Sequence, residues 1–159
     1  MTAREFAVSL ITSKGNIMAK PTPQQASFTE LLPLCKAMKM KVTDVEDGAA
    51  TLTMPYDPEM IGDPETGVIH GGPVSVLLDS VSGLAVTMHP DNTGMTATID
   101  LRIDYMRPAP PRQDLTASAQ VYHTTRTVAF IRATAWAADE NKPIAQATGA
   151  FVFARKSDK

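Results

Sequence analysis

The chain has 159 residues, of which 43% are hydrophobic and 20% charged, and its formal net charge is −2. This size fits one domain with a core of its own, and the weak negative charge disfavours nucleic-acid binding. The single cysteine, Cys35, excludes an internal disulfide and fits a reducing compartment, so we expect a cytoplasmic protein. The longest apolar stretch, residues 74–88, is interrupted by Asp79 and is too short to span a membrane.

The N-terminal part of the sequence divides at two prolines. They separate an arm, residues 1–23, from a domain expected over residues 24–159. Apolar side chains recur every three or four residues over 24–40, which predicts an amphipathic helix. Pro33 lies inside this pattern and is expected to kink the helix or to break it in two, because proline lacks the N–H that a helix interior needs.

A hairpin is predicted after this helix. Residues 41–46 and 49–56 have strand patterns, and the pair Asp47–Gly48 between them is a good turn signal. Residues 55–67 are rich in proline and glycine, which predicts a long loop leading out of the hairpin.

The second half of the chain combines one helix with further strands. Residues 73–88 form a pattern that is apolar nearly all round, which is typical of a helix inside a protein. Strand patterns follow at 99–105, 115–121, 127–137 and 144–153. Because strands follow strands directly, the sheet is expected to be antiparallel. The predicted fold class is α+β, with an antiparallel sheet wrapped around one central helix, the arrangement called a hotdog fold.

Chemistry is suggested first by the start of the central helix, where His70, Gly71 and Gly72 precede Pro73. Two glycines let a ligand approach the backbone closely. Unpaired N–H groups and the positive end of the helix dipole suit a developing oxyanion, such as the tetrahedral intermediate of acyl transfer. The alternative is structural: the glycines allow a tight entry into the helix, and the histidine holds backbone groups of the loop.

Asp79 is the second candidate, nine residues after His70. A carboxylate on an apolar helix is costly unless it is paired or used. Ser75, Ser82 and Gly83 share its helical face, so a narrow polar stripe is predicted along the helix. A hydrogen bond from Asp79 to those serines or to a neighbouring loop would explain the residue without a catalytic role.

Several other site types are missing from the sequence. No histidine, cysteine, aspartate or glutamate cluster has metal-ligand spacing. The phosphate-binding Walker loop, the dinucleotide fingerprint and the Gly-x-Ser-x-Gly nucleophile elbow are absent as well. A carboxylate, helix-start amides and water remain, which is enough for a hydrolase that uses no metal and no cofactor.

Five segments of the chain form a specific combination. They are His70-Gly71-Gly72, Leu78-Asp79, Gly83-Leu84-Ala85, Asp100-Leu101-Arg102-Ile103-Asp104-Tyr105-Met106-Arg107-Pro108-Ala109 and Ala145-Gln146-Ala147-Thr148-Gly149. Together they closely resemble the hotdog thioesterases of the phenylacetate-pathway (PaaI) type. The resemblance covers roughly residues 42–153.

This resemblance implies an enzyme without a cofactor that cleaves acyl- or aryl-CoA thioesters to the free acid and CoA. In that family the aspartate at the place of Asp79 activates water or attacks the thioester. The amide at the place of Gly71 polarises the thioester carbonyl, the histidine at the place of His70 supports the site, and a hydroxyl residue at the place of Thr98 assists. The candidate substrate-binding residues are Gly72, Ser82 and Thr98.

One position departs from the family pattern. Many relatives carry Asn or Gln six residues before the histidine, where this chain has Pro64. Either Glu65 or Thr66 substitutes for that amide, or the mechanism depends more on Asp79, whose role as base or nucleophile stays open. The family also implies basic side chains on the nucleotide phosphates, although solvated surface charges explain each candidate as well. The candidates are Arg102, Arg107, Arg126 and Arg132.

The spacing of the candidates predicts a site shared between two chains. Gly71 or Gly72 and Asp79 are two helical turns apart, about 10–12 Å at a rise of roughly 1.5 Å per residue. One thioester carbonyl cannot reach both groups. We therefore expect a homodimer, or a dimer of dimers, with two antiparallel central helices and the active site at the subunit interface. Two other functions remain open: a hotdog hydratase or dehydratase for enoyl thioesters, and an acyl-CoA-binding protein without catalysis.

Overall fold

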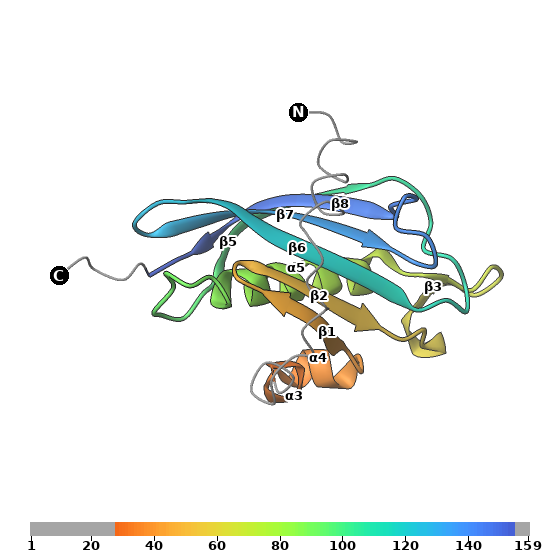
Figure 1. Cartoon of the computed structure of the whole chain (residues 1–159). Coiled ribbons are helices and arrows are strands. Elements are labelled where there is room, and N and C mark those ends of the chain that lie inside the picture. Colours follow the sequence, from red (N-terminus) through yellow and green to blue (C-terminus); the bar gives the residue numbers. More distant parts are fainter. Residues whose placement is uncertain (1–27, 155–159) are drawn as a thin grey trace.

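The computed structural model describes residues 28–154, so the predicted arm over 1–23 lies outside the described residues. Pro33 was expected either to kink the predicted N-terminal helix or to break it, and the structure shows a break. The pieces are α3 (Phe28–Leu31) and α4 (Pro33–Ala37). Both lie beside β1 at the lower edge of the molecule in Figure 1.

The main sheet has six strands, and every neighbouring pair is antiparallel. Its spatial order is β1-β2-β6-β7-β8-β5, so β1 and β5 are the two edge strands. The strands are β1 (Lys41–Glu46), β2 (Ala49–Met54), β5 (Thr98–Tyr105), β6 (Leu115–Thr124), β7 (Val128–Trp136) and β8 (Ala145–Val152). The predicted hairpin, its turn at Asp47–Gly48 and the antiparallel α+β arrangement are confirmed.

The central helix α5 (Gly71–Thr87) runs along the concave side of this sheet (Figure 1). One of its faces is fully buried against β2, β6 and β7 and carries Leu77, Leu78 and Val81. The opposite face, with Ser75 and Asp79, is only half-buried. The helix was expected to be buried all round. In this chain only one face of α5 is fully buried, because the single sheet covers one side of the helix.

The predicted long loop contains short elements that the sequence did not reveal. A 3₁₀ turn, η1 (Pro58–Met60), leads into a small hairpin of β3 (Ile61–Asp63) and β4 (Val68–Ile69). The hairpin delivers the chain to α5, and the N–H of His70 donates to the carbonyl of Met60 at 2.9 Å. Gly62 lies directly against His70: a Cβ at Gly62 would be 2.9 Å from the His70 Cα.

No helix in residues 28–154 has the length and apolar character needed to cross a membrane. The hydrophobic core lies between α5 and the sheet, and its largest fully buried side chains include Phe151, Phe153 and Leu52. Hydrogen bonds join α5 to the edge strand β5, among them one between Tyr105 and Gly71 and one between Thr98 and Asp79.

Candidate active site

The first turn of α5 has one backbone donor to spare. His70 is the N-cap, with an extended backbone at φ −60° and ψ 147°, and its Nδ1 accepts the N–H of Gly72 at 2.9 Å. Pro73 has no N–H, and the amide of Val74 is the first that a regular helix pairs with the N-cap carbonyl. The Gly71 N–H has no acceptor among residues 28–154. It is therefore the amide that the helix start offers to a ligand.

The carbonyl of Gly71 is, by contrast, heavily used. It accepts the Ser75 hydroxyl at 3.1 Å and the Tyr105 hydroxyl at 2.9 Å. The two hydroxyl oxygens are themselves 2.6 Å apart. Tyr105, at the end of β5, was not among the predicted site residues. Its alternation with charged neighbours looks like an ordinary strand pattern, and the sequence marked it only as part of the segment from Asp100 to Ala109 that resembles the thioesterases.

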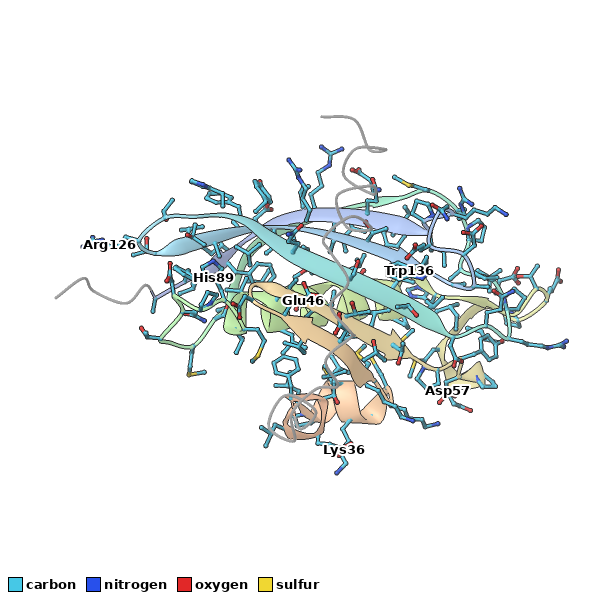
Figure 2. The ribbon with its side chains drawn as sticks, viewed as in Figure 1. Lys36, Glu46, Asp57, His89, Arg126 and Trp136 are labelled. Atoms are coloured by element: carbon cyan, nitrogen blue, oxygen red, sulfur yellow. The ribbon has the colours of Figure 1, made fainter. Side chains whose placement is uncertain are left out.

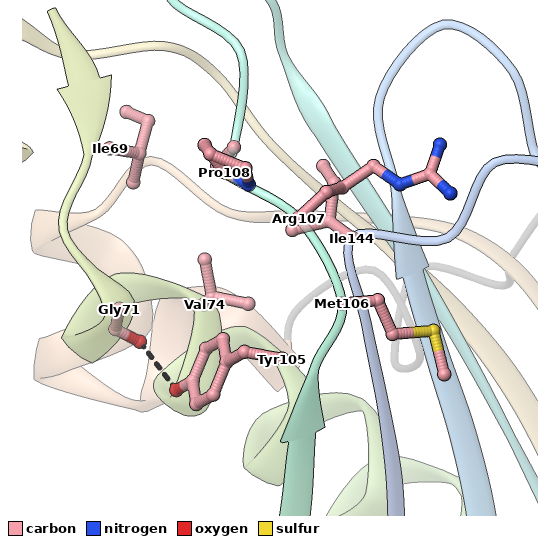
Figure 3. A pocket seen from close by; sticks show the side chains of 9 residues that line it. Ile69, Gly71, Val74, Tyr105, Met106, Arg107, Pro108 and Ile144 are labelled. Atoms are coloured by element: carbon pink, nitrogen blue, oxygen red, sulfur yellow. Dashed lines mark hydrogen bonds between the residues drawn. The ribbon is translucent and has the colours of Figure 1, made fainter.

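A pocket of about 340 Å³ opens beside this helix start (Figure 3). Its wall combines Gly71 and Tyr105 with apolar side chains, including Val74 and Ile144. Arg107 also lines it, and Figure 3 shows its guanidinium extending away from Gly71. Its size and mostly apolar lining suit an apolar chain.

The other three candidate arginines lie outside this pocket wall. Arg102 pairs with Asp104 at 2.9 Å, and both side chains are mostly exposed. The Arg132 guanidinium lies 4.5 Å from the centre of the Tyr122 ring. Arg126 projects from the turn between β6 and β7, at the end of the sheet opposite Asp57 and the β3–β4 hairpin (Figure 2). Among the four, Arg107 alone is at the pocket.

Asp79 lies two turns further along α5 and is half-buried. The Thr98 hydroxyl, from the first residue of β5, donates to its Oδ1 at 2.7 Å. The serines of the predicted polar stripe bind elsewhere. Ser82 is fully buried and donates to the Leu78 carbonyl at 2.7 Å, while Ser75 is engaged with Gly71. The structure thus brings Thr98 to Asp79 and leaves Ser82 away from it.

One chain does not bring Asp79 and Gly71 together. They are eight positions apart along the helix, which is about 12 Å, and Asp79 is absent from the wall of the pocket at Gly71. The two candidate groups of a single chain are therefore apart, and we call them the two half-sites: an amide half at Gly71 and a carboxylate half at Asp79. β5 contacts both, through Tyr105 and Thr98.

Comparisons with known proteins show the family of this chain. The family described as Thioesterase superfamily matches residues 66–144. The chain is also 37% identical over 105 residues to "Putative esterase VNG_1336C" of Halobacterium salinarum, covering 64% of this chain and 68% of the relative. The chain belongs to the thioesterase superfamily. It is a thioester hydrolase, as the sequence predicted.

Further relatives extend the comparison of this thioesterase. It is 28% identical over 118 residues to the medium/long-chain acyl-CoA thioesterase YigI of Escherichia coli K12, covering 66% of this chain and 76% of that protein. A solved structure from Pseudomonas aeruginosa shares 36% identity at a TM-score of 0.72, covering 81% of this chain and 96% of that one. The E. coli PaaI protein of the phenylacetic acid degradation operon, at 23% identity, a TM-score of 0.71 and coverage of 86% and 94%, has the same fold.

In this thioesterase, Pro64 stands where many relatives carry Asn or Gln, and the turn around it is held by hydrogen bonds of its own. Pro64 lies in the β3–β4 turn, where the neighbouring Asp63 accepts the Thr66 hydroxyl at 2.5 Å and the Glu65 N–H at 3.0 Å. These two bonds, that of Thr66 foremost, hold the pKa of Asp63 below its ordinary value. The Thr66 hydroxyl is thus engaged within its own turn. Within residues 28–154, the thioesterase has no group of three metal-ligating side chains.

Proposed function

We propose that this thioesterase hydrolyses acyl-CoA thioesters, aryl or aliphatic, to the free acid and CoA. The apolar wall of the pocket suits the acyl or pantetheine part of such a substrate. The E. coli relative is named for the same substrate class. The observation that carries the proposal is the Gly71 N–H, which is the one first-turn amide without an acceptor in the described chain and belongs to a residue that lines the pocket.

In the proposed mechanism the Gly71 N–H donates to the thioester carbonyl oxygen. The positive end of the α5 dipole adds to this interaction as the oxygen gains negative charge in the tetrahedral intermediate. His70 supports the donor, because its Nδ1 holds the neighbouring Gly72 N–H and caps the helix. Gly72 leaves the backbone accessible to the substrate.

Asp79 is the proposed base or nucleophile. As a base, it takes a proton from water while the water oxygen bonds to the thioester carbon; the C–S bond then breaks and the CoA sulfur leaves, taking up a proton. As a nucleophile, its carboxylate bonds to that carbon, expels the CoA thiolate and forms an anhydride, which water then opens. Either role needs an oriented carboxylate, and Thr98 supplies one orienting hydrogen bond.

We further propose that the two half-sites meet across a homodimer, alone or as a dimer of dimers. Two features of the chain support this arrangement. The edge strand β5 exposes 57% of Ile99, and the half-buried face of α5 carries Asp79. Two antiparallel α5 helices would place the Asp79 of one chain opposite the Gly71 of the other.

Among the four arginines, Arg107 is the one proposed to bind a CoA phosphate. Its side chain starts at the pocket wall and extends away from Gly71 (Figure 3), so its charge can meet a phosphate at a distance from the proposed donor. The cytoplasmic location expected from the single cysteine stays a prediction.

The test is thiol release from a panel of acyl-CoAs, with two variants of Gly71. Gly71→Pro removes the proposed donor and suits the backbone, because proline is favoured at the first helical position and His70 already has the extended conformation that precedes proline. Gly71→Ala keeps the N–H, and its Cβ would meet the Tyr105 ring at an ordinary 3.5 Å.

We expect Gly71→Pro to lower kcat about 10²–10³-fold, the usual loss for one oxyanion donor, and Gly71→Ala to lose far less. Equal loss in both variants would contradict the assignment of Gly71. Addition of water to an enoyl-CoA without thiol release would favour a hydratase. Binding of acyl-CoA without turnover would favour a sensor.

A further inference from the structure

The peptide unit between Gly71 and Gly72 is held at both ends. Its carbonyl oxygen accepts the hydroxyls of Tyr105 at 2.9 Å and Ser75 at 3.1 Å. Its N–H donates to Nδ1 of His70 at 2.9 Å. On the other side of Gly71, the N–H of His70 is bonded to the Met60 carbonyl. The Gly71 amide therefore lies between two anchored segments of backbone.

Anchors matter here because glycine does not fix its own backbone. With no Cβ, Gly71 and Gly72 have wide ranges of φ and ψ, and Pro73 adds no N–H bond that could help to order the turn. The direction of the Gly71 N–H is set by how the two flanking peptide planes are held. The bonds to the Gly71 carbonyl fix one of these planes, and Tyr105 contributes the one that comes from outside α5.

We propose that Tyr105 is a positioning residue for catalysis, which aims the Gly71 N–H at the thioester carbonyl by holding the Gly71 carbonyl from β5. This rests on the proposed function of Gly71 as oxyanion donor. Tyr105 acts through the backbone: its hydroxyl is bonded to Gly71 and Ser75, and its ring lines the pocket beside them. A preorganised donor needs no rearrangement when negative charge develops on the carbonyl oxygen. The orientation of the Gly71 N–H therefore contributes to kcat more than to KM.

Ser75 is partly redundant with Tyr105. Three oxygens, those of Ser75, Tyr105 and the Gly71 carbonyl, share two hydroxyl hydrogens. Either hydroxyl alone can still donate to the carbonyl when the other is removed. We therefore expect Tyr105→Phe and Ser75→Ala each to have a modest effect, and the double variant to lose more than the product of the two single losses.

The experiment compares Tyr105→Phe with Tyr122→Phe in the full chain. Tyr122 is matched in exposure, 49% against 51%, and the same substitution keeps its ring under Arg132. Two quantities are measured: kcat and KM with one acyl-CoA, and the ¹H–¹⁵N resonances of the Gly71 and Gly72 amides. Because phenylalanine keeps the ring, a resonance shift reports the lost hydroxyl and not a lost ring current.

For Tyr105→Phe we expect kcat to fall about 3- to 10-fold, the range of one net hydrogen bond, with KM nearly unchanged. Both glycine resonances should move, and Tyr122→Phe should change neither quantity. Unmoved resonances in Tyr105→Phe and in Ser75→Ala would overturn the proposal. So would moved resonances with unchanged kcat. A wild-type protein that releases no thiol would refute the proposed function, while the resonances would still report whether Tyr105 holds the amide.

Discussion

The Thr98 hydroxyl donates to Oδ1 of Asp79 at 2.7 Å, from the first residue of β5 to the half-buried face of α5. This bond is the direct side-chain link between the carboxylate and the sheet. Tyr105 makes the corresponding link at the other end of the same strand, to Gly71. One edge strand therefore orients both the proposed carboxylate and the proposed oxyanion donor. Movement of β5 would change both halves of the site together.

Asp79→Asn is expected to lower kcat by several orders of magnitude in a protein that stays folded. Asparagine keeps the volume and can still accept the Thr98 hydroxyl, so packing should survive. It can neither take a proton from water nor attack the thioester carbon, so both proposed roles fail together. The melting temperature should be at least that of the wild type, since a half-buried charge is removed.

Single-turnover hydrolysis and thermal unfolding of one sample test this expectation. Asp100→Asn, on an exposed residue of β5, is the matched control and should keep full activity. Near-wild-type turnover in a well-folded Asp79→Asn protein would refute the catalytic assignment. A large drop in melting temperature with normal activity per folded molecule would instead indicate a structural role.

Thr98→Val is expected to reduce kcat about 10- to 100-fold, because a hydrogen bond to a charged group is stronger than a neutral one. Valine keeps the β-branched shape that suits a strand. Thr98→Ser keeps the hydroxyl and should retain most of the activity. Equal losses in the two variants, measured by steady-state thiol release, would show that the hydroxyl is not what matters at this position.

Hydrophobic periodicity was enough to predict most of the fold. The apolar run of α5, the alternating strands and the Asp47–Gly48 turn each have a local physical cause, and the structure confirms them. The β3–β4 hairpin escaped prediction because strands of three and two residues among glycines and prolines have no measurable period. The hairpin also positions the N-cap of α5, because the His70 N–H donates to the carbonyl of Met60.

The site was less predictable, because side-chain partners depend on contacts between distant segments. Ser82 follows Asp79 by three residues, which suggested a shared polar stripe, but its hydroxyl bonds back to the Leu78 carbonyl on the buried side. Such local bonds compete with any bond to a neighbouring side chain. Tyr105 and Gly71 are 34 positions apart in the sequence, and their contact forms only once β5 is placed in the sheet. The resemblance to known thioesterases, not periodicity, identified Thr98.

Asp63 gives the β3–β4 turn a dependence on pH. Its bonds from Thr66 and Glu65 lower its pKa in the folded state below the ordinary 3.8. A lowered folded-state pKa means that the ionised form stabilises the fold above pH 3.8, and that this contribution is lost as the pH falls through the lower value. Asp63→Asn should therefore lower the melting temperature at pH 7 and reduce its fall below pH 4. Unchanged melting curves at both pH values would contradict this, and Asp100→Asn is again the control.

Mixing two inactive variants decides whether the site is shared between chains. Asp79→Asn removes the carboxylate half, and Gly71→Pro removes the amide half. If each site combines Asp79 of one chain with Gly71 of its partner, a mixed dimer has one site with both defects and one with neither. It should then recover about half of the wild-type activity, and an equal mixture after subunit exchange about a quarter, since random pairing makes half of the dimers mixed.

If instead one chain supplied both groups, every site in the mixture would contain one defect, and activity would stay at the level of the separate variants. The measurement is thiol release before and after co-refolding equal amounts of the two proteins, each of which is inactive when refolded alone. A wild-type sample refolded in parallel corrects for losses on refolding. The 12 Å separation of the two groups along α5, from roughly 1.5 Å of rise per residue, makes recovery the expected result, because no thioester carbonyl spans that distance.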